Sequence, residues 1–258
     1  MSDWLGLVIG NSRLHWAWFV NDILESAWDT DHLSTAIDSS EALVRILPRQ
    51  YQNVVREKIQ EKNLLICLAS VVPQQTSIWQ NYPTKKVLAL ADLPLKGIYP
   101  SLGIDRALAV CGAGKKYGYP CLVIDAGTAL TLTGVDRQKT LIGGAILPGL
   151  GLQLKSLHQK TAALPQVALA NELPNRWALA TEEAIASGIV YTLTAGIYGY
   201  IEDWLTKYPD SRVIFTGGDS RIISQHLNCI YPRIYELAVI DQKLTFWGLK
   251  IVKENSIN

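Results

Sequence analysis

The sequence has few of the residues that mark secreted, metal-binding or nucleic-acid-binding proteins. Its 258 residues include only four cysteines, and no Cys-x-x-Cys pair occurs, which disfavours a disulfide framework or a zinc site. Charged residues make up 18% and the net charge is +1, so the basic face of a nucleic-acid-binding protein is not expected. No uninterrupted apolar run approaches the roughly 18 residues that span a bilayer. These absences favour a reduced, cytoplasmic enzyme without nucleic-acid or membrane partners.

Hydrophobic residues make up 48% of the chain, enough for one large core or two compact halves. Two glycine-containing apolar stretches recur, over residues 5–20 and 121–135. In each, an apolar run is followed by a tight turn and by apolar residues at every second position, such as Leu14, Trp16 and Trp18. This pattern predicts two β-hairpins. Walker and Rossmann loops are thereby disfavoured, because a helix follows their glycines.

The rest of the pattern predicts an α/β protein. Helices are expected over residues 39–62, 105–117, 151–161 and 181–207, and further strands over residues 63–72, 140–149 and 213–219, the last running into a Gly-Gly turn. Residues 253–258 are expected to be a frayed tail. The order of elements repeats and predicts two related halves, 1–117 and 118–258, each a mixed β-sheet flanked by helices.

Three glycine turns suggest nucleotide binding. Gly10 and Gly127 each open a tight turn with small hydroxyl residues beside it, and Gly217–Gly218 follows a third strand. Such turns expose N–H groups that can receive phosphate oxygens. Each turn taken singly has a plain alternative, because glycine is common in hairpin turns for conformational reasons alone.

Two aspartates stand at positions that suit chemistry. Asp125 ends an apolar strand before Gly127, where it could hold a cation beside phosphate or cap the N–H groups of its own turn. Asp105 begins a predicted helix and Arg106 follows it. Asp105 could accept a hydroxyl proton while Arg106 binds a carboxylate or phosphate. The alternative is an acid that stabilises a helix start beside a surface arginine.

Taken together, five segments resemble the type III pantothenate kinases of the actin/sugar-kinase/chaperone ATPase superfamily. They are Leu102–Arg106, Asp125–Thr131, Gly143–Gly149, Thr181 with Ser187–Gly188, and Thr216–Asp219. The resemblance runs through nearly the whole chain. It implies two ribonuclease-H-like, actin-like halves and ATP-dependent phosphorylation of pantothenate, the first committed step towards coenzyme A.

The resemblance also implies a role for each matching residue. Asp105 would be the general base and Asp125 would hold the monovalent cation, potassium or ammonium, while Mg²⁺ would accompany ATP. The pantothenate pocket would include Tyr99, Gly103, Ile104, Asp105, Arg106 and Thr181, the last across a homodimer interface. The ATP site would include Val8, Ile9, Gly10, Asn11, Ser12, Arg13, Leu14, His15, Thr128, Gly217 and Gly218.

One position departs from the family pattern. The first phosphate loop of the family carries an aspartate two positions before its glycine, where this chain has Val8. A valine cannot bind magnesium, yet the charge of a transferring phosphoryl group must still be balanced. Three alternatives follow: another group such as Asp125 serves both ions, activity is weakened, or the chain is a nucleotide-binding regulatory protein. A different small-molecule kinase of the superfamily is a further alternative.

Dimerisation has one further sequence hint. Residues 184–200 form an apolar segment rich in glycine, alanine and aromatic residues. Such a helix suits a subunit interface or an ordinary core equally well.

Overall fold

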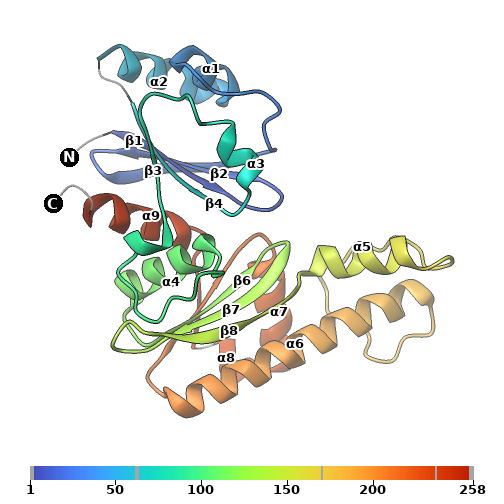
Figure 1. Ribbon diagram of the computed structural model, residues 1–258. Coiled ribbons are helices and arrows are strands. Elements are labelled where there is room, and N and C mark those ends of the chain that lie inside the picture. Colours follow the sequence, from blue (N-terminus) through green and yellow to red (C-terminus); the bar gives the residue numbers. More distant parts are fainter. Residues whose placement is uncertain (1–2, 62–63, 170, 236, 256–258) are drawn as a thin grey trace. The chain divides into compact units, whose positions relative to one another are not determined.

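Two five-stranded mixed sheets form the framework of the protein (Figure 1). The computed structural model describes residues 3–61, 64–169, 171–235 and 237–255. The first sheet has the order β3-β2-β1-β4-β5. Its strands are β1 (Trp4–Ile9), β2 (Leu14–Val20), β3 (Ile23–Thr30), β4 (Leu65–Ser70) and β5 (Lys85–Val87).

The second sheet repeats this topology with the order β10-β9-β6-β7-β8. Its strands are β6 (Cys121–Ala126), β7 (Ala129–Val135), β8 (Leu141–Pro148), β9 (Arg212–Thr216) and β10 (Ala238–Ile240). In both sheets three antiparallel strands are followed by two parallel ones, so β1 corresponds to β6 and β4 to β9. The predicted hairpins and the repeated α/β architecture are confirmed.

Helices α1 (Ser40–Ile46) and α2 (Arg49–Glu61) stand where the sequence predicted one continuous helix. The prediction of a single helix was wrong because Leu47 precedes Pro48, and a residue before proline is driven out of the helical region. Leu47 accordingly has a ψ of 150°. The break also rotates α2, so that Val55 is buried and Val54, expected on the apolar face, is exposed.

The core of the first sheet lies beneath α1 and α2. Leu14, Trp16 and Trp18 of β2 are buried there together, as their spacing predicted. The other face of β1 packs on α9 (Leu244–Asn255), where an ideal Cβ built on Gly6 would lie 2.6 Å from Leu249 Cδ2. Along α9, Gly248 leaves room for the backbone of Leu108 in α4 (Ile104–Tyr117). Two short helices complete this region, α3 (Pro73–Ser77) and the 3-10 helix η1 (Leu90–Asp92).

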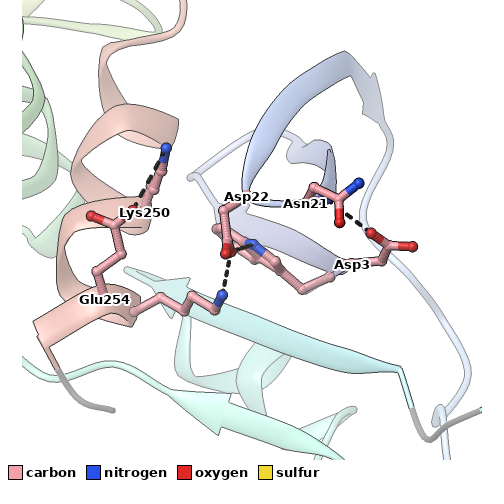
Figure 2. Close-up of polar contacts among 7 residues, drawn as sticks. Asp3, Asn21, Asp22, Lys250 and Glu254 are labelled. Carbon is pink, nitrogen blue, oxygen red and sulfur yellow. Dashed lines mark hydrogen bonds and ion pairs between the residues drawn. The ribbon is translucent and has the colours of Figure 1, made fainter. Parts of the chain in front are cut away.

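The C-terminal segment is anchored, which corrects the expectation of a frayed tail from Lys253 onward. The Lys253 side chain is 3% exposed and forms an ion pair with Asp22, which also accepts a hydrogen bond of 2.9 Å from Trp4 Nε1. The Lys253 ammonium lies 5.2 Å from the centroid of the Trp4 ring. Figure 2 shows this cluster, in which α9 is joined to the turn between β2 and β3. Residues 256–258 lie outside the described residues.

Helix α6 (Thr181–Lys207) is the longest helix of the described chain. By length and composition it could cross a membrane, although the core helix of a globular protein passes the same test. Its residues Ile185, Ile189, Leu193 and Ile197 recur every fourth position and are buried against the second sheet. Helices α5 (Leu150–Lys160), α7 (Ser220–Ile230) and α8 (Pro232–Tyr235) contribute to the same core. We therefore assign α6 to the core.

The chain divides into two compact units. The first comprises Met1–Pro94, Tyr99–Gly112 and Thr245–Asn258, and the second comprises Leu95–Ile98 and Ala113–Leu244. The division differs from the predicted ranges 1–117 and 118–258 chiefly at α9, which packs on β1 although it follows the second sheet in sequence. Leu95–Ile98 joins the second unit through the bridge between Lys96 and Thr140.

The buried ion pair between Asp22 and Lys253 yields a stability prediction. Asp22→Asn keeps an acceptor for Trp4 and suits the positive φ of 63° at this turn, but removes the charge opposite Lys253. We expect the free energy of unfolding, measured by urea denaturation, to fall by about 3 kcal/mol, the scale of removing one partner of a buried pair.

The exposed pair Asp203–Lys207, with side chains 68% and 62% exposed, is the matched control. Asp203→Asn should change the free energy of unfolding by less than about 0.5 kcal/mol. Equal losses in the two variants would contradict an anchoring role for Asp22.

Candidate functional site

The first glycine loop is a tight four-residue turn between β1 and β2. The Gly10 N–H donates to the Arg13 carbonyl at 3.0 Å, and His32 Nε2 donates to the Gly10 carbonyl at 2.9 Å. The side chains of Asn11, Ser12 and Arg13 are exposed, and those of Val8, Ile9 and Leu14 are buried in the sheet. Any contact of the last three residues with a ligand would therefore involve their backbone.

The first turn of α4 and the segment before it bring five predicted residues together in the first unit. Asp105 Oδ1 accepts a 2.8 Å hydrogen bond from the N–H of Arg106, and Arg106 Nη1 donates to the Tyr99 hydroxyl at 3.0 Å. An ideal Cβ built on Gly103 would lie 2.5 Å from Asp105 Oδ1. Gly103 therefore lets the carboxylate fold back over the start of the helix, while the buried Ile104 side chain fixes the helix to the core.

The environment of Asp105 suits a base. Burial raises the pKa of Asp105 above its ordinary value, and the hydrogen bond from Arg106 and the charges of Arg106 and His15 offset part of this effect. A carboxylate whose pKa is raised towards the working pH is a better proton acceptor in the transition state. The geometry thus provides a partly buried carboxylate beside an arginine and a phenol.

The second glycine turn, Gly127–Thr128, is enclosed by backbone from two other segments. The Gly149 N–H donates to the Thr128 carbonyl at 2.9 Å, and an ideal Cβ on Gly149 would lie 2.1 Å from the Gly127 carbonyl oxygen. An ideal Cβ on Gly217 would lie 2.6 Å from the carbonyl of Ala126, and Gly217 has a φ of +87°. No side chain fits at either glycine without moving the turn.

Asp125 lies in a row of oxygen-bearing side chains. It is the register partner of Thr131 on β7 and of Thr216 on β9, and side chains directly opposite each other lie on the same face of a sheet. Hydroxyl and carboxylate oxygens suit a hard cation such as potassium. This donor set fits the predicted monovalent cation. No cluster of three or more His, Cys, Asp or Glu side chains suits a metal within the described ranges.

The third turn lies beside Asp125. An ideal Cβ on Gly217 would lie 2.5 Å from Asp125 Oδ1, and the Asp219 N–H donates to the Ala126 carbonyl at 2.9 Å. Gly218 is exposed. Burial raises the pKa of Asp219. The second unit thus gathers Asp125, Thr128 and Gly217 at the ends of β6 and β9.

Thr181 lies apart from these groups. It is the first residue of α6 and borders a hollow of about 500 Å³ lined by Ala163, Pro165, Ala180, Thr181, Glu182 and Glu183. The structure therefore shows two groups of predicted residues, one in each compact unit, and a separate position for Thr181.

Several residues of these groups were missing from the site predicted by sequence, among them Gly149, His32 and Asp29. Gly149 belongs to a recognised segment, but its contact with Gly127 depends on the pairing of β7 with β8. His32 and Asp29 carry no sequence signal, because they reach the first loop and His15 only through the fold.

Comparisons with known proteins show the family of this chain. The family model described as type III pantothenate kinase matches residues 4–203. A relative named Type III pantothenate kinase from Nostoc sp. strain PCC 7120 is 44% identical over 267 aligned residues, covering 97% of this chain and 94% of that protein. The chain belongs to the type III pantothenate kinase family.

Two further comparisons extend this result. A Type III pantothenate kinase from Synechocystis sp. strain PCC 6803 is 44% identical over 251 residues, covering 96% of this chain and 90% of that protein. The structure also resembles the activator of the 2-hydroxyisocaproyl-CoA dehydratase from Clostridium difficile with bound ADPNP, with a TM-score of 0.55 and 11% identity over 99% of this chain and 96% of that one. The second likeness concerns the fold alone and agrees with two actin-like halves.

The close approach of Gly149 to the second turn gives a steric prediction. Gly149 has a φ of −67°, which alanine adopts freely, so Gly149→Ala tests space without backbone strain. We expect it to lower the free energy of unfolding by about 2 kcal/mol, the scale of overpacking, and to weaken ATP binding measured by calorimetry.

Gly151→Ala is the matched control, because an ideal Cβ there meets nothing within 4 Å. Within helix α5 this change should stabilise the protein by up to about 1 kcal/mol. Unchanged stability and ATP affinity in Gly149→Ala would contradict the packing argument.

Proposed function

We propose that this chain transfers the γ-phosphoryl group of ATP to the primary hydroxyl of pantothenate, the first committed step towards coenzyme A. The observation that carries the proposal is the arrangement of Asp105, Arg106 and Tyr99 at the start of α4, in a chain of the type III pantothenate kinase family. The raised pKa of Asp105 supports its role as the base that accepts the hydroxyl proton.

The remaining roles follow from the chemistry of each group. Arg106, with Tyr99, Gly103 and Ile104 around it, would bind the acceptor, since a guanidinium pairs well with a carboxylate. Thr128, Gly217 and Gly218 would receive ATP through hydroxyl and N–H groups, together with the exposed loop Gly10–Arg13. Phosphoryl transfer then depends on positioning and on balancing the phosphate charge. Thr181, at the hollow before α6, would contact pantothenate.

Cations would share this balancing of charge. Asp125, with Thr131 and Thr216 beside it, would hold potassium or ammonium. Mg²⁺ would enter with ATP and offset the charge of its phosphates. Because Val8 offers no carboxylate at the first loop, a nucleotide-binding regulatory protein is the second candidate function. In that case ATP would bind, but the purified protein with ATP, magnesium and potassium would form no phosphopantothenate.

Asp105→Asn tests the proposed base. We expect this variant to bind ATP as the wild type does, while its kcat falls by roughly 100-fold or more, the scale of losing a general base. Phosphopantothenate formation in a coupled assay is the measurement. In the wild type, kcat should fall as the pH is lowered through the raised pKa of Asp105, because the protonated carboxyl cannot accept a proton.

Two outcomes would contradict the assignment. Normal turnover by Asp105→Asn would exclude Asp105 as the general base. No turnover by the wild type would favour the regulatory alternative.

We further propose that the protein is a homodimer and works in the cytoplasm. The face of α6 turned away from the core carries small exposed residues: Ala184, Gly188, Thr192, Gly196 and Gly199. In the segment before α6, Trp177 and Leu179 are 91% and 106% exposed. Exposed apolar side chains beside a small-residue helix face suit a second copy of the chain. The buried thiols of Cys67, Cys111 and Cys121, none of them in a disulfide, fit a reducing compartment.

Gly188→Trp should convert the dimer to a monomer, because a bulky side chain would hold the two helix faces apart. Sedimentation equilibrium measures the mass, and Gln138→Trp, at an exposed turn of the second sheet, is the control that should remain dimeric. A wild-type mass of one chain at all concentrations would contradict the proposal.

A further inference from the structure

The internal repeat identifies what replaces a carboxylate at the first loop. Val8 in β1 corresponds to Asp125 in β6, because each is the penultimate residue of a central strand and stands two residues before a loop glycine. The register partner of Asp125 on the next antiparallel strand is Thr131, and that of Val8 is His15. The row that offers oxygen ligands in the second unit therefore offers an imidazole in the first.

His15 is held by a carboxylate from the next strand. Its register partner on β3 is Asp29, and His15 Nδ1 lies 2.7 Å from Asp29 Oδ1. The other ring nitrogen faces the loop: an ideal Cβ on Gly10 would lie 3.2 Å from His15 Nε2. The absence of a side chain at Gly10 keeps this nitrogen beside the loop backbone.

The tautomer follows from the hydrogen bond. The pKa of Asp29 lies below its ordinary value, chiefly because of its hydrogen bond with His15 Nδ1. The charges of His15 and Arg13 lower it further, and burial opposes this effect. At neutral pH Asp29 is therefore ionised and accepts a hydrogen bond from the Nδ1–H of His15. Nε2 then carries a proton only in the imidazolium, so Nε2 can donate to a phosphate oxygen only in the charged form.

Resting on the proposed kinase function, we propose that His15 binds the β- and γ-phosphate oxygens of ATP through Nε2. It supplies at the first loop the positive charge that a carboxylate-bound cation supplies beside Asp125, and Asp29 is its positioning residue. An exposed ion pair adds little stability by itself, and the two side chains are 40% and 45% exposed. The position of His15 Nε2 beside Gly10 suits the binding of a ligand at the first loop.

The remaining charged groups around His15 fit this role. Arg13 of the same loop acts electrostatically on Asp29, and His15 lies near enough to Asp105 of α4 to act on it electrostatically. His32 donates to the Gly10 carbonyl and so fixes the loop.

The test measures nucleotide affinity separately from turnover. His15→Gln should weaken ATP binding roughly 10-fold or more, the scale of losing a charge-assisted hydrogen bond, and leave AMP binding unchanged because AMP lacks the β- and γ-phosphates. His15→Lys should restore much of the ATP affinity. His158→Gln, on the exposed face of α5, is the matched control and should bind both nucleotides as the wild type does.

Asp29→Asn tests positioning. The amide cannot hold His15 Nδ1 through a charge-assisted hydrogen bond, so ATP affinity should fall several-fold, whereas AMP affinity should stay unchanged. The same change in the His15→Gln background should lower ATP affinity no further. A role of Asp29 confined to packing would lower both affinities equally.

The double variant Val8→Asp, His15→Gln tests whether a carboxylate-bound magnesium ion can replace the imidazolium of His15 at the first loop. The added carboxylate should restore ATP affinity only when magnesium is present. Equal ATP affinity in wild type and His15→Gln, or equal losses for ATP and AMP, would overturn the proposal for His15. A wild type that binds ATP through His15 yet forms no phosphopantothenate would refute the kinase function alone.

Discussion

The close packing of backbone around the Gly127–Thr128 turn is the constraint on which the rest of the second unit depends. An ideal Cβ on Gly149 would overlap the carbonyl groups of this turn, and one on Gly217 would overlap the carbonyl of Ala126 just before it. Phosphate oxygens need N–H groups that no side chain covers. The same absence of side chains brings Gly217 beside Asp125. One packing arrangement thus sets both the turn proposed to receive phosphate and the position of Asp125, the carboxylate proposed to hold the charge-balancing cation.

The two units share a topology and differ in the charges they carry. Each sheet has a central strand that ends at a glycine turn, with three antiparallel and two parallel strands in the same order. In the second unit the row at this turn is Thr131, Asp125 and Thr216. In the first unit the row includes Val8, His15 and Asp29. The carboxylate of this row therefore stands on the edge strand β3 and not on the central strand β1. We propose that both rows meet phosphate, one through a cation and the other through an imidazolium.

Periodicity and motif spacing predicted the hairpins, the repeated halves and the segment that holds Asp105, because these are local patterns. The break at Pro48 was also present in the sequence, although the apolar spacing of residues 39–62 obscured it. Other features depend on contacts distant in sequence. Lys253 is buried because Asp22 and Trp4 lie beside it, and Asp29 reaches His15 only because β3 pairs with β2. Local patterns carry no signal for such contacts.

The central claim is that a cation held by Asp125 balances the phosphate charge during phosphoryl transfer. Potassium titration of phosphopantothenate formation, by the wild type and by Asp125→Asn, tests it most directly. The wild type should require potassium, and Asp125→Asn should need far more potassium for half-maximal turnover or show no response to it. Identical potassium dependence in the two proteins would contradict the account.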